Sequence, residues 1–158
     1  MDRTARDRTL RATVLAAAQL VGWVRWDLSG SQRPVMSIEA RRVVTPPAIR
    51  VFRGISQAWK MDFREEMRLL GLRRPVWSKY ARGCPQVLPI ETLRRVVFLA
   101  RVFEAINLLF PPERADVWMR APNAAPMFGG RSALDLMVEE GPPGVSAVRL
   151  YLQGQLYG

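Results

Sequence analysis

The sequence predicts an all-α protein, with a helix-turn-helix module, a long connecting helix, a small helical C-terminal module and an extra helix at the N-terminus. Three observations support this prediction. Apolar residues recur at steps of three and four in several segments, which is the spacing of one helical face. Prolines precede several of these segments and glycines follow them, as expected at helix starts and ends. We expect three parts: an N-terminal arm and linker at 1–45, the helix-turn-helix module with the long helix at 46–109, and the C-terminal module at 110–158.

An amphipathic helix is expected in the N-terminal arm, from Arg6 to Leu28. Its uncharged run is too short to span a membrane, and no small-residue cleavage site follows it. We therefore expect it to pack on its own protein or on a second copy, and peripheral membrane attachment is a weaker alternative. A linker to Pro47 follows, and a start of translation at Met36 would remove the arm. The apolar positions at alternating steps of four and three are Leu10, Val14, Ala17, Val21, Val24 and Leu28.

The middle module is expected to begin with a helix from Pro46 to about Trp59. Thr45 would cap its N-terminus, and proline suits the first helical position because no amide is needed there. Phe52 and Ile55 would lie on its buried face. The prediction therefore places the end of the linker at Thr45.

Two short helices separated by a glycine follow this helix. Asp62 would begin the first, and Glu65, three residues later, would complete an acidic capping box. Gly71 would end it, because a tight turn needs a residue in the left-handed conformation. The second helix would run from Pro75 to about Arg82. A helix, a glycine turn and a basic helix form the helix-turn-helix pattern.

The second of these helices is expected to enter the major groove of DNA, where its N-terminal side chains reach base edges. Val76 and Tyr80 are expected in the core, and Trp77 could belong there as well. The expected DNA-binding residues are Arg73, Arg74, Trp77 and Ser78 near the bases, with Lys79 and Arg82 on phosphates.

The charge distribution supports a nucleic-acid partner for the middle of the chain. The net charge is +10, and residues 48–109 carry 12 Lys and Arg against five acidic residues. Residues 110–158 carry four against five. A cationic segment suits a polyanion, whereas a near-neutral segment suits a protein surface. Arginine makes up 22 of the 24 basic residues, a bias that a GC-rich genome can also produce.

One long helix is expected from Ile90 to Phe110, between Pro89 and Pro111. Its polar residues form a narrow strip, so it must be buried on several sides. The helix-turn-helix core, the C-terminal module and a second protomer could each cover it. We expect this helix to join the two modules, and we expect a homodimer, because two-fold dimers read paired half-sites on DNA.

Two short helices joined by a loop are expected between Leu109 and Met137. Pro112 would open the first, and Pro122 would end it. Ser132 would cap the second by accepting a hydrogen bond from the amide of Asp135. A turn at Gly141-Pro-Pro-Gly144 and a final helix from Val145 to Tyr157 complete the chain.

The same stretch resembles the C-terminal toxin-binding domain of the Xre/MbcA/ParS family of antitoxins. The resemblance extends from about residue 48 to residue 158, with a weaker upstream part in the helix-turn-helix. Val148, Leu152 and Gly158 match the closing pattern of the family. The most specific matches are Trp118, Arg120, Pro122, Asn123, Phe128, Gly129, Gly130, Arg131, Ser132, Leu134, Asp135 and Leu136.

This resemblance implies an antitoxin that binds a RES-domain toxin, a class whose members consume or transfer parts of NAD, and that represses its own operon. It implies that the C-terminal residues reach toward the active site of the toxin. For two of the matching residues we favour a structural role: Asn123 would bond turn amides, and Arg131 would tie the loop to a carboxylate. The expected toxin-binding residues are Trp118, Arg120, Asn123, Phe128, Arg131, Gln155, Tyr157 and Gly158.

The composition argues against an enzyme. The chain has no histidine and a single cysteine, Cys84, which excludes disulfides within one chain, most zinc sites and all histidine-based catalysis. Asp135 and Glu139 lie one helical turn apart and are expected on a solvated face. The sequence Gly129-Gly130-Arg131-Ser132 lacks the lysine of a phosphate-binding loop. We therefore expect no cofactor, no metal and a cytoplasmic protein, which suits the lone thiol.

The expected partners are a RES-domain toxin, promoter DNA and a second copy of the chain, without a membrane. The alternative from a different class is a stand-alone helix-turn-helix transcriptional regulator. In that alternative the C-terminal module would serve dimerisation or bind an effector.

Overall fold

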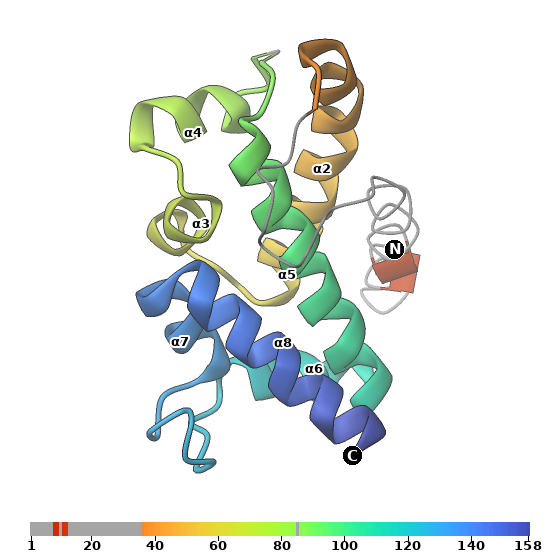
Figure 1. Ribbon diagram of the computed structural model, residues 1–158, viewed down its shortest axis with the longest axis vertical. Coiled ribbons are helices and arrows are strands. Elements are labelled where there is room, and N and C mark those ends of the chain that lie inside the picture. Colours follow the sequence, from red (N-terminus) through yellow and green to blue (C-terminus); the bar gives the residue numbers. More distant parts are fainter. Residues whose placement is uncertain (1–7, 10, 13–35, 85) are drawn as a thin grey trace.

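The computed structural model describes residues 8, 9, 11, 12, 36–84 and 86–158 (Figure 1). All regular secondary structure in these residues is helical, which confirms the predicted fold class. None of the helices in this part of the chain is long and apolar enough to cross a membrane. The helices are α2 (Ile38–Ala58), α3 (Phe63–Leu70), α4 (Arg74–Ala81), α5 (Ile90–Leu109), α6 (Pro112–Arg120), α7 (Ala133–Glu140) and α8 (Pro142–Tyr157).

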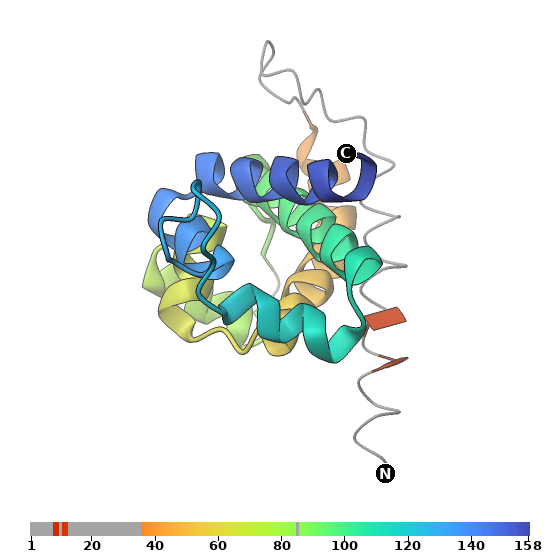
Figure 2. The ribbon, with the colours of Figure 1, turned by 90° about the horizontal axis from the view of Figure 1, so that it is seen from below.

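Helix α5 is the central element of the fold. It contacts α2, α3, α6 and α8, so that neighbours cover it on several sides (Figures 1 and 2). Leu93, Val96, Leu99 and Ile106 are fully buried along its length. A helix that is apolar over most of its circumference requires such cover. The predicted burial of this helix on several sides is therefore confirmed.

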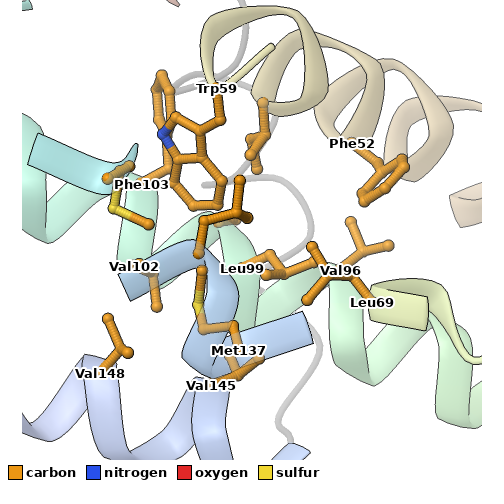
Figure 3. Close-up of a cluster of buried hydrophobic side chains, with 14 of the residues drawn as sticks. Phe52, Trp59, Leu69, Val96, Leu99, Val102, Phe103, Met137, Val145 and Val148 are labelled. Atoms are coloured by element: carbon orange, nitrogen blue, oxygen red, sulfur yellow. The ribbon is translucent and has the colours of Figure 1, made fainter. Parts of the chain in front are cut away.

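One hydrophobic core extends through every helix from α2 to α8. Figure 3 shows Phe52 of α2, Trp59 at the C-terminal cap of α2 and Leu69 of α3 together with residues of α5 and of the C-terminal helices α7 and α8. Helix α7 also lies against α3. The predicted modules thus share their interior, and the domain boundary at residue 110 remains a prediction.

Helix α2 begins at Ile38, eight residues before the predicted start, so part of the expected linker is helical. Ser37 is the N-cap, and its Oγ accepts a hydrogen bond from the amide of Ala40 at 3.1 Å. Pro46 and Pro47 lie inside the helix. The prediction of a start at Pro46 was therefore wrong.

Two features explain how a helix accommodates this proline pair. The carbonyls that the prolines leave without an amide donor belong to Arg42 and Val43, which are both exposed, so water can bond them. Thr45, predicted as the N-cap, is buried instead. Its hydroxyl donates to the carbonyl of Arg41 at 2.7 Å and accepts from the amide of Leu88 at 3.0 Å. A contact with a distant segment thus fixes this part of α2.

Helix α8 also begins earlier than predicted, at Pro142 instead of Val145. Its prolines occupy the first turn, where no amide partner is needed. Gly144 belongs to this turn, and a Cβ there would lie 2.6 Å from the carbonyl oxygen of Leu136. The expected four-residue turn is therefore reduced to Gly141. Helices α7 and α8 approach each other too closely at Gly144 for any side chain there.

The described part of the N-terminal arm packs on its own protein. Arg11 is buried at the corner between α5 and α6. Its guanidinium donates to Oδ1 of Asn107 at 2.6 Å and to the carbonyl of Pro112 at 3.2 Å, and it forms an ion pair with Asp116. It also lies 5.8 Å from the ring centroid of Phe103. Most of the helix predicted from Arg6 to Leu28 lies outside the described residues.

Candidate functional site

Helices α3 and α4 form the predicted helix-turn-helix, and its local hydrogen bonds agree with the prediction. The amide of Glu65 donates to Oδ1 of Asp62 at 2.8 Å, and the amide of Asp62 donates to Oε2 of Glu65 at 2.9 Å. The capping box is therefore confirmed. Gly71 ends α3 with a φ of 66°, the left-handed conformation that was expected.

Helix α5 holds the end of α3 in place. Arg95 donates to the carbonyls of Arg68 and Leu69 at 3.3 and 3.4 Å, and Thr92 donates to that of Leu70 at 3.0 Å. Burial lowers the pKa of Arg95 from its ordinary value, but the guanidinium remains protonated at neutral pH. A Cβ at Gly71 would lie 2.6 Å from Cζ of Arg95. Glycine is therefore needed here both for the turn and for this contact.

Trp77 orients α4 from inside the core. It is 2 % exposed, and its Nε1 donates to Oε2 of Glu66 at 2.8 Å. Its ring also packs edge-on against Phe52, with the centroids 5.6 Å apart. Oε1 of Glu66 accepts from Ser56 at 2.6 Å. The prediction that Trp77 reaches DNA is therefore corrected, because its side chain has no exposed surface.

The remaining predicted DNA-binding residues lie on the outside of α4 and at its two ends. Ser78 is half-buried, and Arg74 lies 5.8 Å from the ring centroid of Phe63. The acidic residues of α3 are engaged within the protein, Glu66 with Trp77 and Glu65 with Arg120. Among these candidates, Arg73, Arg74, Lys79 and Arg82 are exposed and form no ion pair with the residues that the structure describes. Their positive charge is therefore available to a polyanionic partner.

The opposite end contains an aromatic cluster formed by Phe110, Trp118, Phe128 and Tyr151. Trp118 stacks between Phe110 and Tyr151, with centroid distances of 6.4 and 6.3 Å. Phe128 packs edge-on against Trp118 and Tyr151 and is 0 % exposed. The prediction that Phe128 contacts the toxin directly is therefore corrected, because Phe128 is a core residue. Trp118 is half-buried.

The loop between α6 and α7 is held by two of the predicted toxin-binding residues. Oδ1 of Asn123 accepts from the amide of Ala125 at 2.9 Å, and its backbone pairs with Gly130 and Arg131. Arg131 donates to Glu139 at 2.8 Å and to Glu140 at 3.1 Å. The structural roles expected for Asn123 and Arg131 are therefore confirmed.

The charged side chains of this loop bond other groups of the loop and of helix α7. Hydrogen bonds to Glu139 and then to Glu140 raise the pKa of Arg131 above its ordinary value. The hydroxyl of Ser132 accepts from the amide of Asp135 at 3.0 Å, so the predicted cap is confirmed. Asp135 in turn accepts from that hydroxyl at 2.7 Å. These acidic groups are engaged with the loop and the helix cap.

The side chain of Arg120, a predicted toxin contact, makes several contacts within its own chain. Its side chain extends to the turn between α2 and α3, where it bonds the carbonyls of Trp59 and Lys60 and the carboxylate of Glu65. The C-terminal candidates, by contrast, are exposed: Tyr157 is 83 % exposed, and Gln155 and Gly158 lie beside it at the end of α8.

Helices α5, α6 and α8 each carry an exposed apolar residue that sequence reasoning missed. Leu108 of α5, Val117 of α6 and Leu150 of α8 are each more than half exposed. Figure 2 views the molecule from the side of the C-terminus, with α5 between α6 and α8. The sequence could have revealed these residues, because each is an apolar residue that lies outside the buried apolar stripe of its helix. We call Leu108, Val117, Trp118, Leu150 and Tyr157 the apolar end.

The fold and these two ends define a helical protein with a basic helix-turn-helix and a separate apolar surface suited to a protein partner. Residues 99–158 match the family model described as the antitoxin Xre/MbcA/ParS C-terminal toxin-binding domain. The chain is also 32 % identical over 115 residues to a protein of Sinorhizobium fredii (strain NBRC 101917 / NGR234) that bears the name "Uncharacterized protein y4oB", an alignment that covers 72 % of this chain and 87 % of the relative.

This chain belongs to the Xre/MbcA/ParS antitoxin family. Its role is that of the antitoxin in a toxin–antitoxin pair, and its protein partner is a toxin. The matched domain begins at Leu99 within α5, whereas the predicted C-terminal module began at residue 110. The C-terminal half of α5 therefore belongs to the toxin-binding domain.

Proposed function

We propose that this chain neutralises a RES-domain toxin by covering its active site, and that it represses its own operon. The observation that carries the proposal is the match of residues 99–158 to a toxin-binding domain. The resemblance of residues 118–136 to antitoxins that pair with RES-domain toxins supports the choice of toxin class. Inhibition is steric, so this chain supplies surfaces and no catalytic group.

The apolar end is the proposed toxin-binding surface. Large apolar side chains such as Val117 and Leu150 gain about 25 cal/mol for each Å² that a partner covers. Grouped exposed apolar residues are typical of protein interfaces. The exposed part of half-buried Trp118 offers the kind of aromatic anchor that dominates binding energy in many interfaces. All five residues of the apolar end lie within the matched residues 99–158, so the family match and the apolar end point to the same region.

The last residues of α8 are the part of this surface that we assign to the active site of the toxin. Val148 and Leu152 anchor the helix in the core, whereas Gln155, Tyr157 and Gly158 are exposed at its end. A rigid helix end with one aromatic side chain can fill a concave site, which is the usual shape of a small-molecule pocket. Substrate is then excluded because its place is occupied.

Promoter binding is assigned to α4 and the basic residues around it. Arg73 and Arg74 are placed for base edges, and Lys79 and Arg82 for phosphates. Helix α4 and the C-terminal end of α8 lie at opposite ends of the molecule (Figure 1). One chain can therefore hold DNA and toxin at the same time without a steric conflict between the two partners.

The test is the cellular NAD level, together with growth, in cells that express the neighbouring open reading frame alone or with this chain. We expect NAD to fall when the neighbour is expressed alone and to recover with the full chain. Tyr157→Ala should prevent recovery, whereas Val43→Ala, an exposed apolar residue on α2, should not. If the neighbour leaves NAD and growth unchanged, the proposed toxin class is wrong.

A further inference from the structure

Arg120, at the end of α6, joins the toxin-binding domain to the helix-turn-helix. Its Nε donates to the carbonyl of Trp59 at 2.6 Å, and its Nη2 donates to that of Lys60 at 2.5 Å. The two Nη atoms also bond the carboxylate of Glu65 at 2.8 and 3.3 Å. All three guanidinium nitrogens therefore have acceptors in the turn between α2 and α3 or in the first turn of α3.

The turn that Arg120 holds is strained. Lys60 has a φ of 51°, a left-handed conformation that is unfavourable for a residue with a Cβ. The carbonyls of Trp59 and Lys60 lie at the C-terminal end of α2, where the helix dipole is negative and favours a cation. Arg120 supplies that cation. The conformation of this turn therefore depends on a side chain from the toxin-binding domain.

Two successive carboxylates transmit this contact to α4. Glu65 bonds Arg120, and the next residue, Glu66, bonds the indole of Trp77. The first turn of α3 is thus attached to the toxin-binding domain through Glu65 and to α4 through Glu66. A shift of α3 must move Trp77, because the buried ring fills the space between the helices.

We propose that Arg120 is a positioning residue for α4, so that the toxin-binding domain sets the affinity for DNA without touching DNA. This inference rests on the promoter binding proposed above. Base readout needs side chains held close to their productive geometry by supporting contacts. Arg120 provides such support for α4 through Glu65 and α3, which means that DNA binding is a property of the whole chain.

The test uses the full chain and the duplex that lies immediately upstream of its gene, titrated by fluorescence anisotropy at several salt concentrations. Arg120→Ala should weaken binding about tenfold, which corresponds to about 1.4 kcal/mol. Arg120→Lys should recover part of the loss, because one ammonium cannot bond both carbonyls and the carboxylate. The matched control is Arg114→Ala, an exposed arginine of the same helix, which should change the affinity less than about twofold.

Two further readouts separate positioning from other roles. The salt dependence should keep its slope in Arg120→Ala, whereas the loss of a phosphate contact lowers the slope by about one. In a Glu65→Gln background, Arg120→Ala should have much less effect, because coupled residues are not additive. Affinity for the toxin, measured in parallel, should stay close to that of the unmodified chain.

Three results would overturn the inference. The first is an Arg120→Ala chain that binds the duplex as tightly as the unmodified chain, and the second is a reduced salt slope. The third is a loss of toxin affinity with DNA affinity unchanged, which would place Arg120 at the toxin interface. If circular dichroism shows that Arg120→Ala does not fold, Arg120→Lys and Glu65→Gln replace it. Each should then bind the duplex more weakly with an unchanged salt slope. If the unmodified chain binds no upstream duplex, promoter binding itself fails, and the inference fails with it.

Discussion

The two ends of the molecule present different surfaces built on different supports. At the basic end, polar contacts from Glu66, Arg95 and Arg120 hold α3 and α4, and arginine and lysine side chains are exposed. At the apolar end, stacked rings around Trp118 form the support, and aliphatic side chains with Tyr157 are exposed.

This comparison shows that several of the residues that identify the family have structural roles within the domain. Asn123 and Arg131 hold the loop, and Phe128 fills the core beneath it. The exposed residues Leu108, Val117 and Leu150 belong to no motif. The family motif therefore includes residues that support the toxin-binding domain, while most residues of the proposed contact surface lie at helix positions outside the motif.

The largest expected effect is that of Phe128→Ala, which tests the aromatic support of the apolar end. Removing a fully buried phenylalanine should lower the free energy of unfolding by about 3–5 kcal/mol. Urea denaturation measures this change. Val43→Ala is the control and should change stability by less than about 0.5 kcal/mol. An equal, small effect of both would mean that Phe128 does not support this end.

Gly71→Ala tests the basic end in the same way. The left-handed conformation costs alanine about 1–2 kcal/mol, and the new Cβ would displace the guanidinium of Arg95. We expect a stability loss of about 2 kcal/mol and weaker DNA binding, while toxin inhibition is retained. Gly83→Ala is the comparison, because Gly83 also has a positive φ but has open space around it. This variant should lose only the stability that alanine costs in the left-handed conformation. Equal losses in the two variants would argue against the contact with Arg95.

Lys79→Ala tests whether the exposed charge contacts DNA without supporting the fold. Because Lys79 is exposed, stability should change by less than about 0.5 kcal/mol. The slope of the logarithm of DNA affinity against the logarithm of salt concentration should fall in magnitude by about one. Anisotropy titrations measure this slope. An unchanged slope would remove Lys79 from the DNA surface.

The smallest effect concerns Tyr80, whose hydroxyl donates to the carbonyl of Val87 at 3.0 Å. Burial raises the pKa of Tyr80 above its ordinary value of 10.0. The stability linked to the neutral phenol is therefore fully present below pH 10.0 and decreases as the pH rises through the higher pKa of the folded state. Tyr80→Phe should abolish this alkaline decrease in thermal unfolding experiments. A decrease that persists in Tyr80→Phe would assign it to another group.

Predictions that depended on neighbouring residues succeeded. The capping box of Asp62 and Glu65, the turn at Gly71 and the cap at Ser132 each involve partners within a few positions in the chain. Such hydrogen bonds form whenever the local backbone is right, so the residue types are sufficient to predict them. The predicted burial of α5 succeeded because its polar strip is too narrow for an exposed helix.

Predictions that depended on distant partners were incomplete. Thr45 matched the pattern of an N-cap. In the structure it is buried and accepts a hydrogen bond from the amide of Leu88, and α2 continues through the two prolines that follow it. Trp77 matched a DNA-reading position, but Glu66 and Phe52 hold it inside. In each case a residue has two chemically reasonable environments, and only packing decides between them.

The sequence by itself determined the helical class, most helix ends, the basic middle of the chain and the antitoxin family, because these follow from local periodicity, caps, charge and residue order. The tertiary structure decided which side chains are exposed, where the apolar end lies and that Arg120 binds the turn between α2 and α3. These features join residues as many as 61 positions apart. Their geometry arises only when the helices pack around α5, since packing brings such residues together and removes them from water.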